Sequence, residues 1–540
     1  MALGDAGRWP RLPGLARPLA RGQLRLAVEG GSAPSLAAVG AVGAVGAGLG
    51  VCTLGISSLP SPWPPLLVVA ALCPFVALVT GHVRRLLLAA VLLDIPFQVG
   101  KHLGYRRDAD ELGALPGWDV SLTTIALAAL YAIWLAELLA RTPGRPRPAV
   151  GASLAPLAYL AFVGLSMLAA ADATLASFEF LLLVQTFLLY LYLVSSVRTR
   201  SDVVFVATLL LVGLAAEGLL MAAMRVAGQS SIGGILGRFD AGDVARGHVD
   251  RLGGTIGSSN AAASYLSLLL APALSLLLTP LGRWHKRLAL LGLALGGVAL
   301  VMTLSRGGWI AFALSLALFC LLAHRRGWLP LTAPLVCAVV VVAAGLLFQD
   351  AIVGRLADDD NGSAHSRLPL MRLALRIIAD QPLLGIGANN YSLVMTDYVT
   401  PDFSDYGGEW LYIVHNKYLL VWAETGLGGL IAFLCYLLAT IWAGWRGWQL
   451  RDRLLSPLAL GLTAAIVGHL VHMSVDLFSG RPQAQTLWTC AALLVAIGRV
   501  GRERRESPAE ARRRGADNWR RPAVAAPAAA LGAPAGGGRR

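Results

Sequence analysis

The sequence predicts an all-α protein, a polytopic bundle of about 14 transmembrane helices with two larger extracytoplasmic loops. The chain of 540 residues is 56% hydrophobic and only 14% charged, and its mean hydropathy is +0.64. Its apolar runs are long enough to cross a bilayer, and its arginines gather in alternate loops between these runs. Soluble domains carry about 25% charged residues, so we expect a membrane protein.

The expected spans are apolar runs of roughly 17–25 residues, because that length crosses the hydrocarbon core of a bilayer as a helix. The third run is short and is interrupted by Asp94 and Pro96. The spans are expected near 34–56, 64–80, 86–100, 120–140, 152–170, 176–197, 203–224, 260–279, 287–303, 307–323, 329–348, 414–443, 456–478 and 483–499.

These spans fall into two groups between two tails. A basic tail over 1–32 precedes the N-terminal transmembrane helices of 33–200, and a second group of helices occupies 201–500. Residues 501–540 are rich first in Arg and Glu and then in Ala, Pro and Gly. That composition cannot bury a core, so we expect a disordered C-terminal tail.

The basic residues indicate an orientation. They form short clusters on one side of the expected membrane, which the positive-inside rule assigns to the cytoplasm together with both termini. The net charge of +14 is therefore spread over loops and does not form the single basic face of a nucleic-acid-binding protein. Loops 225–259 and 349–413 then face the opposite side. The clusters are Arg84/Arg85, Arg141/Arg145/Arg147, Arg198/Arg200, Arg283/Lys286/Arg287, Arg325/Arg326 and Arg446/Arg451/Arg453.

Four polar motifs lie on the extracytoplasmic side, and three of them precede or begin an expected span. They read R-L-G-G-T-I-G-S-S-N (251–260), T-L-S-R-G-G-W (303–309), S-R…P-L-L-G-I-G (366–387) and H-N-K-Y-L…A-E-T-G (415–426). The N-terminus of a helix presents unpaired N–H groups and the positive end of the helix dipole, so each of the three helix starts is a natural site for an anion. A histidine beside these arginines can act as a base beside an anion site.

In this order, the four motifs resemble the O-antigen ligase and polysaccharide polymerase superfamily over roughly residues 200–500. The resemblance implies a catalytic membrane domain at 201–500 in the bacterial inner membrane, with its two larger loops in the periplasm. It also implies the partners: a donor glycan on undecaprenyl diphosphate, and an acceptor that is lipid A-core for a ligase or a second glycan for a polymerase. The sequence does not separate these two activities, because both use the same donor.

The resemblance also assigns roles to individual residues. Arg251, Arg306 and Arg367 would bind the diphosphate, His415 would be the general base, and Asn416 would orient a sugar hydroxyl. Arg372 is a further candidate for substrate binding. The residues alone leave other interpretations open: the arginines can anchor helices at lipid headgroups, and His415 can be an ordinary interfacial histidine.

Glu424, His472 and Asp476 are expected to shape the cavity. His469, His472 and Asp476 share one face of a span, where they can bond neighbouring helices or hold a metal. We expect bonding between helices, no metal and no cofactor. A transporter or flippase is the alternative from another class, because buried charges such as Asp94 and Glu217 would suit one.

Overall fold

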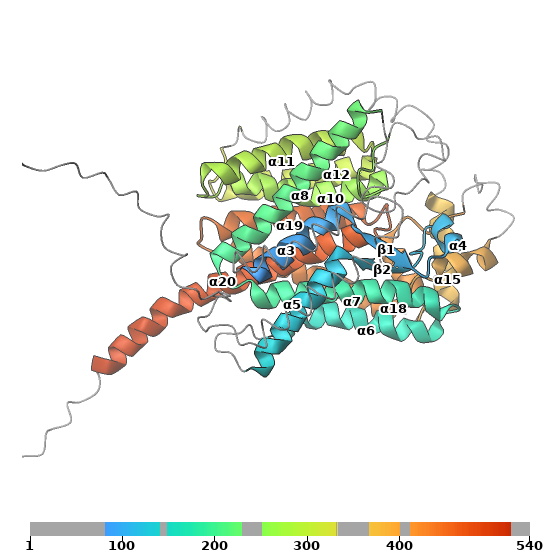
Figure 1. The fold of residues 1–540 in the computed structure, drawn as a ribbon, viewed down its shortest axis with the longest axis horizontal. Helices are drawn as coiled ribbons and strands as arrows, with labels where there is room; N and C mark the ends of the chain where they lie inside the picture. Colours follow the sequence, from blue (N-terminus) through green and yellow to red (C-terminus); the bar gives the residue numbers. More distant parts are fainter. Residues whose placement is uncertain are drawn as a thin grey trace, which may run out of the picture.

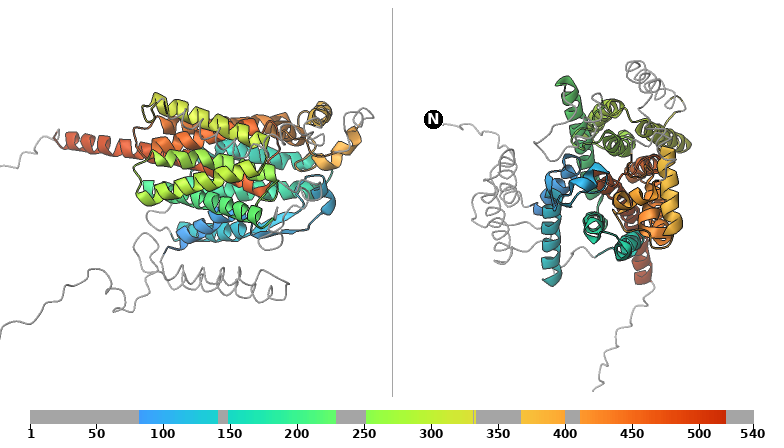
Figure 2. Two further views of the ribbon diagram at one scale, coloured as in Figure 1. Left: turned by 90° about the horizontal axis from the view of Figure 1, so that it is seen from above. Right: turned by 90° about the vertical axis from the view of Figure 1, so that its right-hand side faces the viewer.

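The computed structural model describes residues 82–140, 148–228, 251–330, 332, 367–399 and 411–519. Ten helices in these ranges are long and apolar enough to cross a membrane. They run side by side as one bundle (Figures 1 and 2), which confirms the predicted all-α polytopic fold. Long apolar helices satisfy their own backbone hydrogen bonds, as a bilayer requires.

Each of the ten candidate spans coincides with one predicted span. They are α5 (Leu122–Leu139), the run Val150–Ala169 that contains α6 (Leu154–Ser166), α7 (Ala173–Ser196), α8 (Arg200–Val226), α10 (Ser259–Leu277), α11 (Arg283–Met302), α12 (Arg306–Arg325), α18 (Lys417–Trp448), α19 (Leu455–His472) and the Arg481–Glu503 part of α20 (Arg481–Trp519). The predicted spans 34–56 and 64–80, and all but the first residues of 329–348, lie outside the described residues.

Two predictions need correction. The expected span at 86–100 is the shorter helix α3 (Val83–Phe97), because Pro96 comes before its last residue and the chain then turns into strand β1 (Gly100–Leu103). The tail was expected to be disordered from residue 501, but α20 continues to Trp519 and projects from the bundle (Figure 1). Arg, Glu and Ala are strong helix formers, which explains the extension.

Helix α19 lies at the centre of the bundle, with 83% of its span residues buried, whereas only 28% are buried for the peripheral α5 and α11. Small residues let its neighbours approach closely. A Cβ on Gly461 would lie 2.6 Å from Ser275 Cβ of α10, and one on Gly468 would lie 2.2 Å from Ala311 O of α12. Such contacts are typical of membrane helix packing, where hydrophobicity alone does not drive association.

The predicted cytoplasmic arginines that lie in the described residues gather at one end of the bundle, which we call the tail end because α20 projects from it (Figure 1), whereas Arg141, Arg145 and Arg147 lie outside the described residues. Side chains of several of these arginines, and of Arg499 in α20, join neighbouring helices there. The contacts are Arg84 with Glu137, Arg85 with Asp202 (3.7 Å), Arg200 with Asp452, Arg326 with Trp448 O (3.1 Å) and Arg499 with Val197 O (2.6 Å).

The opposite end is the hairpin end, where β1, α4 (Arg107–Glu111), β2 (Trp118–Ser121) and α15 (Arg367–Asp380) cover the bundle (Figure 1). β1 and β2 pair antiparallel, with Gly100 opposite Ser121. Arg106 forms ion pairs with Asp108 (2.6 Å) and Asp172, which joins this cap to the start of α7. The hydrogen bonds from Arg106 lower the pKa of Asp108 below its usual value.

Helix α15 is amphipathic, as its sequence pattern predicted. Its apolar side consists of Leu370, Leu373, Ala374, Ile377 and Ile378, which are all buried. These side chains pack in a second core with residues of α18 and of the hairpin region, so the apolar side faces protein. The helical periodicity of 366–380 predicts an amphipathic helix that lies on the outer membrane interface, and this prediction is wrong for the apolar side, which protein covers.

Candidate active site

Helices α10, α12 and α18 all begin at the hairpin end, each within one of the sequence motifs. Each start is capped by a side-chain oxygen that accepts backbone N–H groups of the first turn. The caps are Ser258 for α10 (3.2 Å to Ala261 N), Ser305 for α12 (3.3 Å to Gly308 N) and Asn416 for α18 (3.0 Å to Tyr418 N and 3.1 Å to Leu419 N). Three positive helix ends therefore point to the same side of the protein.

Arg251 joins the start of α10 to the turn between α11 and α12. Its Nε donates to Thr303 O at 3.2 Å, and its guanidinium also donates to Asn260 Oδ1 at 2.8 Å. The backbone of the next residue, Leu252, donates to Met302 O at 3.3 Å. The 251–260 motif is thus held against the end of α11, just before Arg306.

Arg306 is the first residue of α12, and Gly307 beside it packs against a histidine of α19. A Cβ on Gly307 would lie 2.7 Å from His472 Cδ2 and 2.8 Å from its Nε2, so only glycine lets the imidazole approach this closely. His472 is buried and stacks edge-on against Phe478 at 4.5 Å between ring centroids. The structure therefore brings the backbone next to Arg306 against the predicted cavity residue His472.

Arg367 begins α15 and lies within electrostatic range of His472. Its Nε is buried and has no hydrogen-bond partner among the described residues. Arg372 lies one turn further and is exposed, on the side of α15 that faces away from the core. Arg367 therefore lies near His472, the residue that also packs beside Arg306, whereas Arg372 lies at the surface.

His415 precedes the start of α18, which is fastened to the turn after α19. The Lys417 backbone N–H donates to Met473 O (2.9 Å) and to Asp476 O (3.1 Å). The Asp476 carboxylate accepts the N–H of its neighbour Leu477 at 2.8 Å and so stabilises this turn. The turn that contains His415 is therefore hydrogen-bonded to the turn that follows His472.

The ring of Tyr412 lies against His415, with 5.4 Å between ring centroids. Gly113 of the hairpin region packs against that tyrosine: a Cβ there would lie 2.3 Å from its Cζ, and the φ of +90° also favours glycine. The segment between β1 and β2 therefore covers the His415 turn. Sequence reasoning missed Tyr412, because nothing in the local pattern distinguishes it from other interfacial tyrosines.

Parts of two sequence motifs are hydrogen-bonded to each other at a kink in α18. Gly426 has a φ of +69°, and the kink frees backbone carbonyls of the preceding turn. Ile386 N–H donates to Ala423 O at 2.9 Å, and Gly387 N–H donates to Glu424 O at 3.0 Å. The L-L-G-I-G and A-E-T-G sequences thus form one structural unit, which explains why both contain glycine.

The Glu424 side chain belongs to this unit. It is buried, and its Oε1 accepts the Tyr391 N–H of α16 (Tyr391–Val394) at 3.3 Å. Asn389 and Asn390, between the glycines and α16, bond the hairpin region and the start of α7: Asn389 Nδ2 donates to Leu115 O and Asn390 Oδ1 accepts from Asp172 N. Glu424 therefore joins elements at this end of the bundle.

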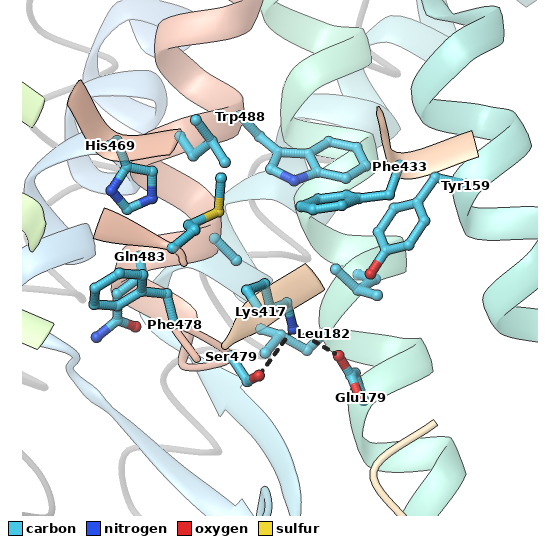
Figure 3. Close-up of a pocket in the computed structure, with 14 residues that line it drawn as sticks. Tyr159, Glu179, Leu182, Lys417, Phe433, His469, Phe478, Ser479, Gln483 and Trp488 are labelled. Atoms are coloured by element: carbon cyan, nitrogen blue, oxygen red, sulfur yellow. Dashed lines mark hydrogen bonds and ion pairs between the residues drawn. The ribbon is translucent and has the colours of Figure 1, made fainter. Parts of the chain in front are cut away.

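Lys417, which sequence reasoning did not select, is a buried cation beside the site. Its Nζ donates to Ser479 Oγ at 2.9 Å and lies 3.7 Å from Glu179 Oε1, as Figure 3 shows. The lysine lines a cavity of about 30 Å³ together with aromatic side chains such as Tyr159 and Trp488. That volume has room for water, which can hydrate the buried ion pair. A lysine at the start of an apolar helix is the sequence signal that could have identified Lys417.

The buried carboxylate of Asp94 is paired. Arg481 lies 2.7 Å from Asp94 Oδ2 through one nitrogen and 2.9 Å from Asp119 Oδ2 through another. Thr123 donates to the same Asp94 oxygen through both its backbone N–H and its hydroxyl. Asp94 therefore holds α3, α5 and α20 together.

His469 and His472 have separate partners. His469 Nδ1 lies 3.4 Å from Ser264 Oγ, whereas His472 packs against Gly307, and the two rings are 6.3 Å apart. Within the described ranges, no group of three or more His, Cys, Asp or Glu side chains could hold a metal ion. These histidines thus serve contacts between helices.

The comparisons with known proteins bear on the region that contains this site. Residues 289–434, less than half of the chain, match the family model described as O-antigen ligase. Of the predicted site residues, Arg306, Arg367, Arg372, His415, Asn416 and Glu424 lie inside the match, whereas Arg251, His472 and Asp476 lie outside it. No match was found among curated proteins.

The match confirms the resemblance to the O-antigen ligase and polysaccharide polymerase superfamily, and residues 289–434 carry its O-antigen ligase domain. Together with the ten candidate spans, it supports a multi-pass membrane protein with a function of the ligase or polymerase type.

Proposed function

We propose that this protein transfers a glycan from undecaprenyl diphosphate to an acceptor hydroxyl at the periplasmic face of the inner membrane. The observation that carries the proposal is the gathering of Arg251, Arg306 and Arg367 near three helix N-termini, at the end that also holds His415. Cationic side chains and helix N-termini both favour a diphosphate.

The reaction is a direct displacement. The acceptor oxygen bonds to the anomeric carbon as the bond from that carbon to the diphosphate oxygen breaks, and His415 takes the acceptor proton. The electron pair leaves with undecaprenyl diphosphate, whose charge the arginines stabilise. Attack opposite the leaving group inverts the anomeric centre, and no step requires a metal ion.

Other residues have supporting roles in this proposal. The Asn416 side-chain oxygen is engaged in the cap of α18, so a sugar hydroxyl would meet its Nδ2 group. Arg372 is exposed on α15, where it can reach the donor only from the outer surface. His472 and Asp476 shape the wall of the site, and Glu424 holds the kink of α18.

The bonding of two buried carboxyl groups disfavours transport as the alternative. Asp94 is bonded to Arg481, and Glu217 is bonded to Thr255, so both carboxyl groups already have partners within the protein. The residues with catalytic potential gather at one end of the bundle, whereas transporters bind their substrates near the middle of the membrane.

The test uses purified protein with a lipid-linked donor and a hydroxyl acceptor, with and without EDTA. We expect turnover that is insensitive to the chelator and a product of inverted anomeric configuration. Retention of configuration or loss of turnover with EDTA would refute the mechanism. Accumulation of lipid-linked glycan on the cytoplasmic side of a deletion strain would instead indicate transport. Surface-glycan analysis of the same strain separates ligase, which loses attachment, from polymerase, which loses chain length.

A further inference from the structure

Glu217 is a buried carboxyl group of α8 that the proposed reaction does not use. It is fully buried, and its partners all lie in the 251–260 motif. Oε1 accepts the Thr255 N–H at 2.9 Å, and Oε2 lies 2.5 Å from Thr255 Oγ1. The backbone of Gly254 sits directly on this group: its φ is +62°, and a Cβ would lie 1.9 Å from Oε1.

The tip of the motif is held on all sides. Besides the bonds to Glu217, the Thr255 hydroxyl lies 2.8 Å from Pro96 O, and Gln98 Nε2 donates to Thr255 O at 3.0 Å. Every polar group of Thr255 is therefore satisfied by α8 or by the end of α3. Movement of the loop around Thr255 therefore requires that these hydrogen bonds break.

These contacts fit the protonated form of Glu217. The Thr255 hydroxyl has one proton but lies within hydrogen-bond distance of two acceptors, Pro96 O and Glu217 Oε2. Both bonds form only if Glu217 is protonated, so that it donates to the hydroxyl and the hydroxyl donates to Pro96 O. A neutral carboxyl group also avoids the cost of an unpaired charge inside the membrane.

The other end of the same loop carries Arg251. The loop closes on itself through Gly257 N–H and Gly253 O at 3.2 Å, and Arg251 bonds Thr303 O and Asn260 Oδ1. The clamp at Thr255 therefore fixes the backbone from which Arg251 reaches Thr303, at the end of α11 and before the cap of α12.

We infer that Glu217, in its neutral form, is a positioning residue that clamps the 251–258 loop and thereby sets Arg251 for the donor. This inference rests on the proposed function for the role of Arg251. It assigns Glu217 a task that requires its hydrogen-bonding shape and not its charge.

The test compares two substitutions in the full-length purified protein. Glu217→Gln keeps an oxygen for Thr255 N–H and supplies an N–H to the hydroxyl, so it should rescue the clamp. Glu217→Ala removes both contacts and should raise the donor KM roughly ten- to hundredfold, with the acceptor KM unchanged. Adding Glu217→Ala to Arg251→Ala should cause little further loss, because both act through one residue.

Amide hydrogen exchange over 252–257 gives a readout that needs no substrate. We expect Glu217→Ala, but not Glu217→Gln, to lose protection there, and Glu111→Ala, which removes an exposed carboxylate of α4 at the same end, to match the wild type. If Glu217→Ala does not accumulate as folded protein, Thr255→Val, which removes only the hydroxyl, takes its place.

Three results would overturn the inference. The first is an equal rise of the donor KM in Glu217→Gln and Glu217→Ala, and the second is unchanged amide protection in Glu217→Ala. The third is a loss in the double variant with Arg251→Ala that equals the product of the two single losses. A wild-type protein that transfers no glycan would refute the proposed function instead, and the exchange result would still decide whether Glu217 clamps the loop.

Discussion

Arg306 occupies the first position of α12, between the cap Ser305 and Gly307, whose backbone touches the ring of His472. An arginine in this position offers a planar fork that matches two phosphate oxygens, whereas lysine offers a single point charge on a flexible chain. The local geometry therefore makes the identity of the cation important.

We predict that Arg306→Lys lowers the rate of glycan transfer nearly as much as Arg306→Ala. Turnover of lipid-linked donor by the purified variants is the measurement. Arg325→Lys is the matched control, because Arg325 is exposed in the last turn of the same helix. A fully active Arg306→Lys protein would show that Arg306 only anchors α12 at the headgroups.

His415 directly precedes the cap of α18, so its side chain can be removed without disturbing the hydrogen bonds of Asn416. We predict that His415→Ala lowers the rate by on the order of 10²–10⁴, the range for loss of a general base, while donor binding remains. Lipid-linked glycan should accumulate in cells that carry this variant. His324→Ala, at an exposed histidine near the far end of α12, is the control. Loss of donor binding in His415→Ala would assign the imidazole to binding.

At the scale of elements, the kink of α18 holds the two glycine motifs together. A Cβ at Gly426 would lie 2.0 Å from Leu383 O, and the φ of +69° disfavours any other residue. The kink therefore depends on one glycine and on the facing turn. It sets the direction in which the start of α18, and with it His415, approaches the site.

We predict that Gly426→Ala destabilises the protein by roughly 1–3 kcal/mol, the cost of a strained backbone conformation, and also lowers turnover. Thermal unfolding in detergent measures the first effect. Gly297→Ala on α11 is the control, since its Cβ would meet open space. Equal stability of the two variants would show that the kink relaxes without cost.

The apolar side of helix α15 is covered by protein, which its sequence pattern does not predict. Its apolar periodicity predicted one buried side correctly, but periodicity does not reveal whether lipid or protein covers that side. Here the side chains pack against α18 and the hairpin region. This packing holds Arg367 near His472 and leaves Arg372 exposed.

For the whole molecule, the arginine clusters of the tail end predict the orientation in the membrane. We expect a reporter fused after Arg326 to indicate the cytoplasm and one fused within 355–365 to indicate the periplasm. Activity of alkaline phosphatase and fluorescence of green fluorescent protein at the two positions are the measurements. A cytoplasmic signal from the second fusion would place His415 in the wrong compartment and remove the basis of the proposed reaction.

The sequence by itself determined the ten spans of the described residues, the starts of α10, α12 and α18, and the gathering of the described basic residues at the tail end. These features depend on local properties: the length of an apolar run, a capping Ser or Asn, and the charge of a short loop. The motif arginines and His415 were found in the same way, because each lies at the boundary between a polar loop and an apolar helix.

Only the tertiary structure decided which of these residues meet. Glu217 bonds Thr255, Lys417 bonds Ser479, and Arg481 bonds Asp94, each across a long separation in the chain. A buried polar group must find a partner, but periodicity and composition do not say which one. The sequence therefore left the roles of the buried residues Asp94 and Glu217 open, and the packing of the helices shows that both bond neighbouring elements.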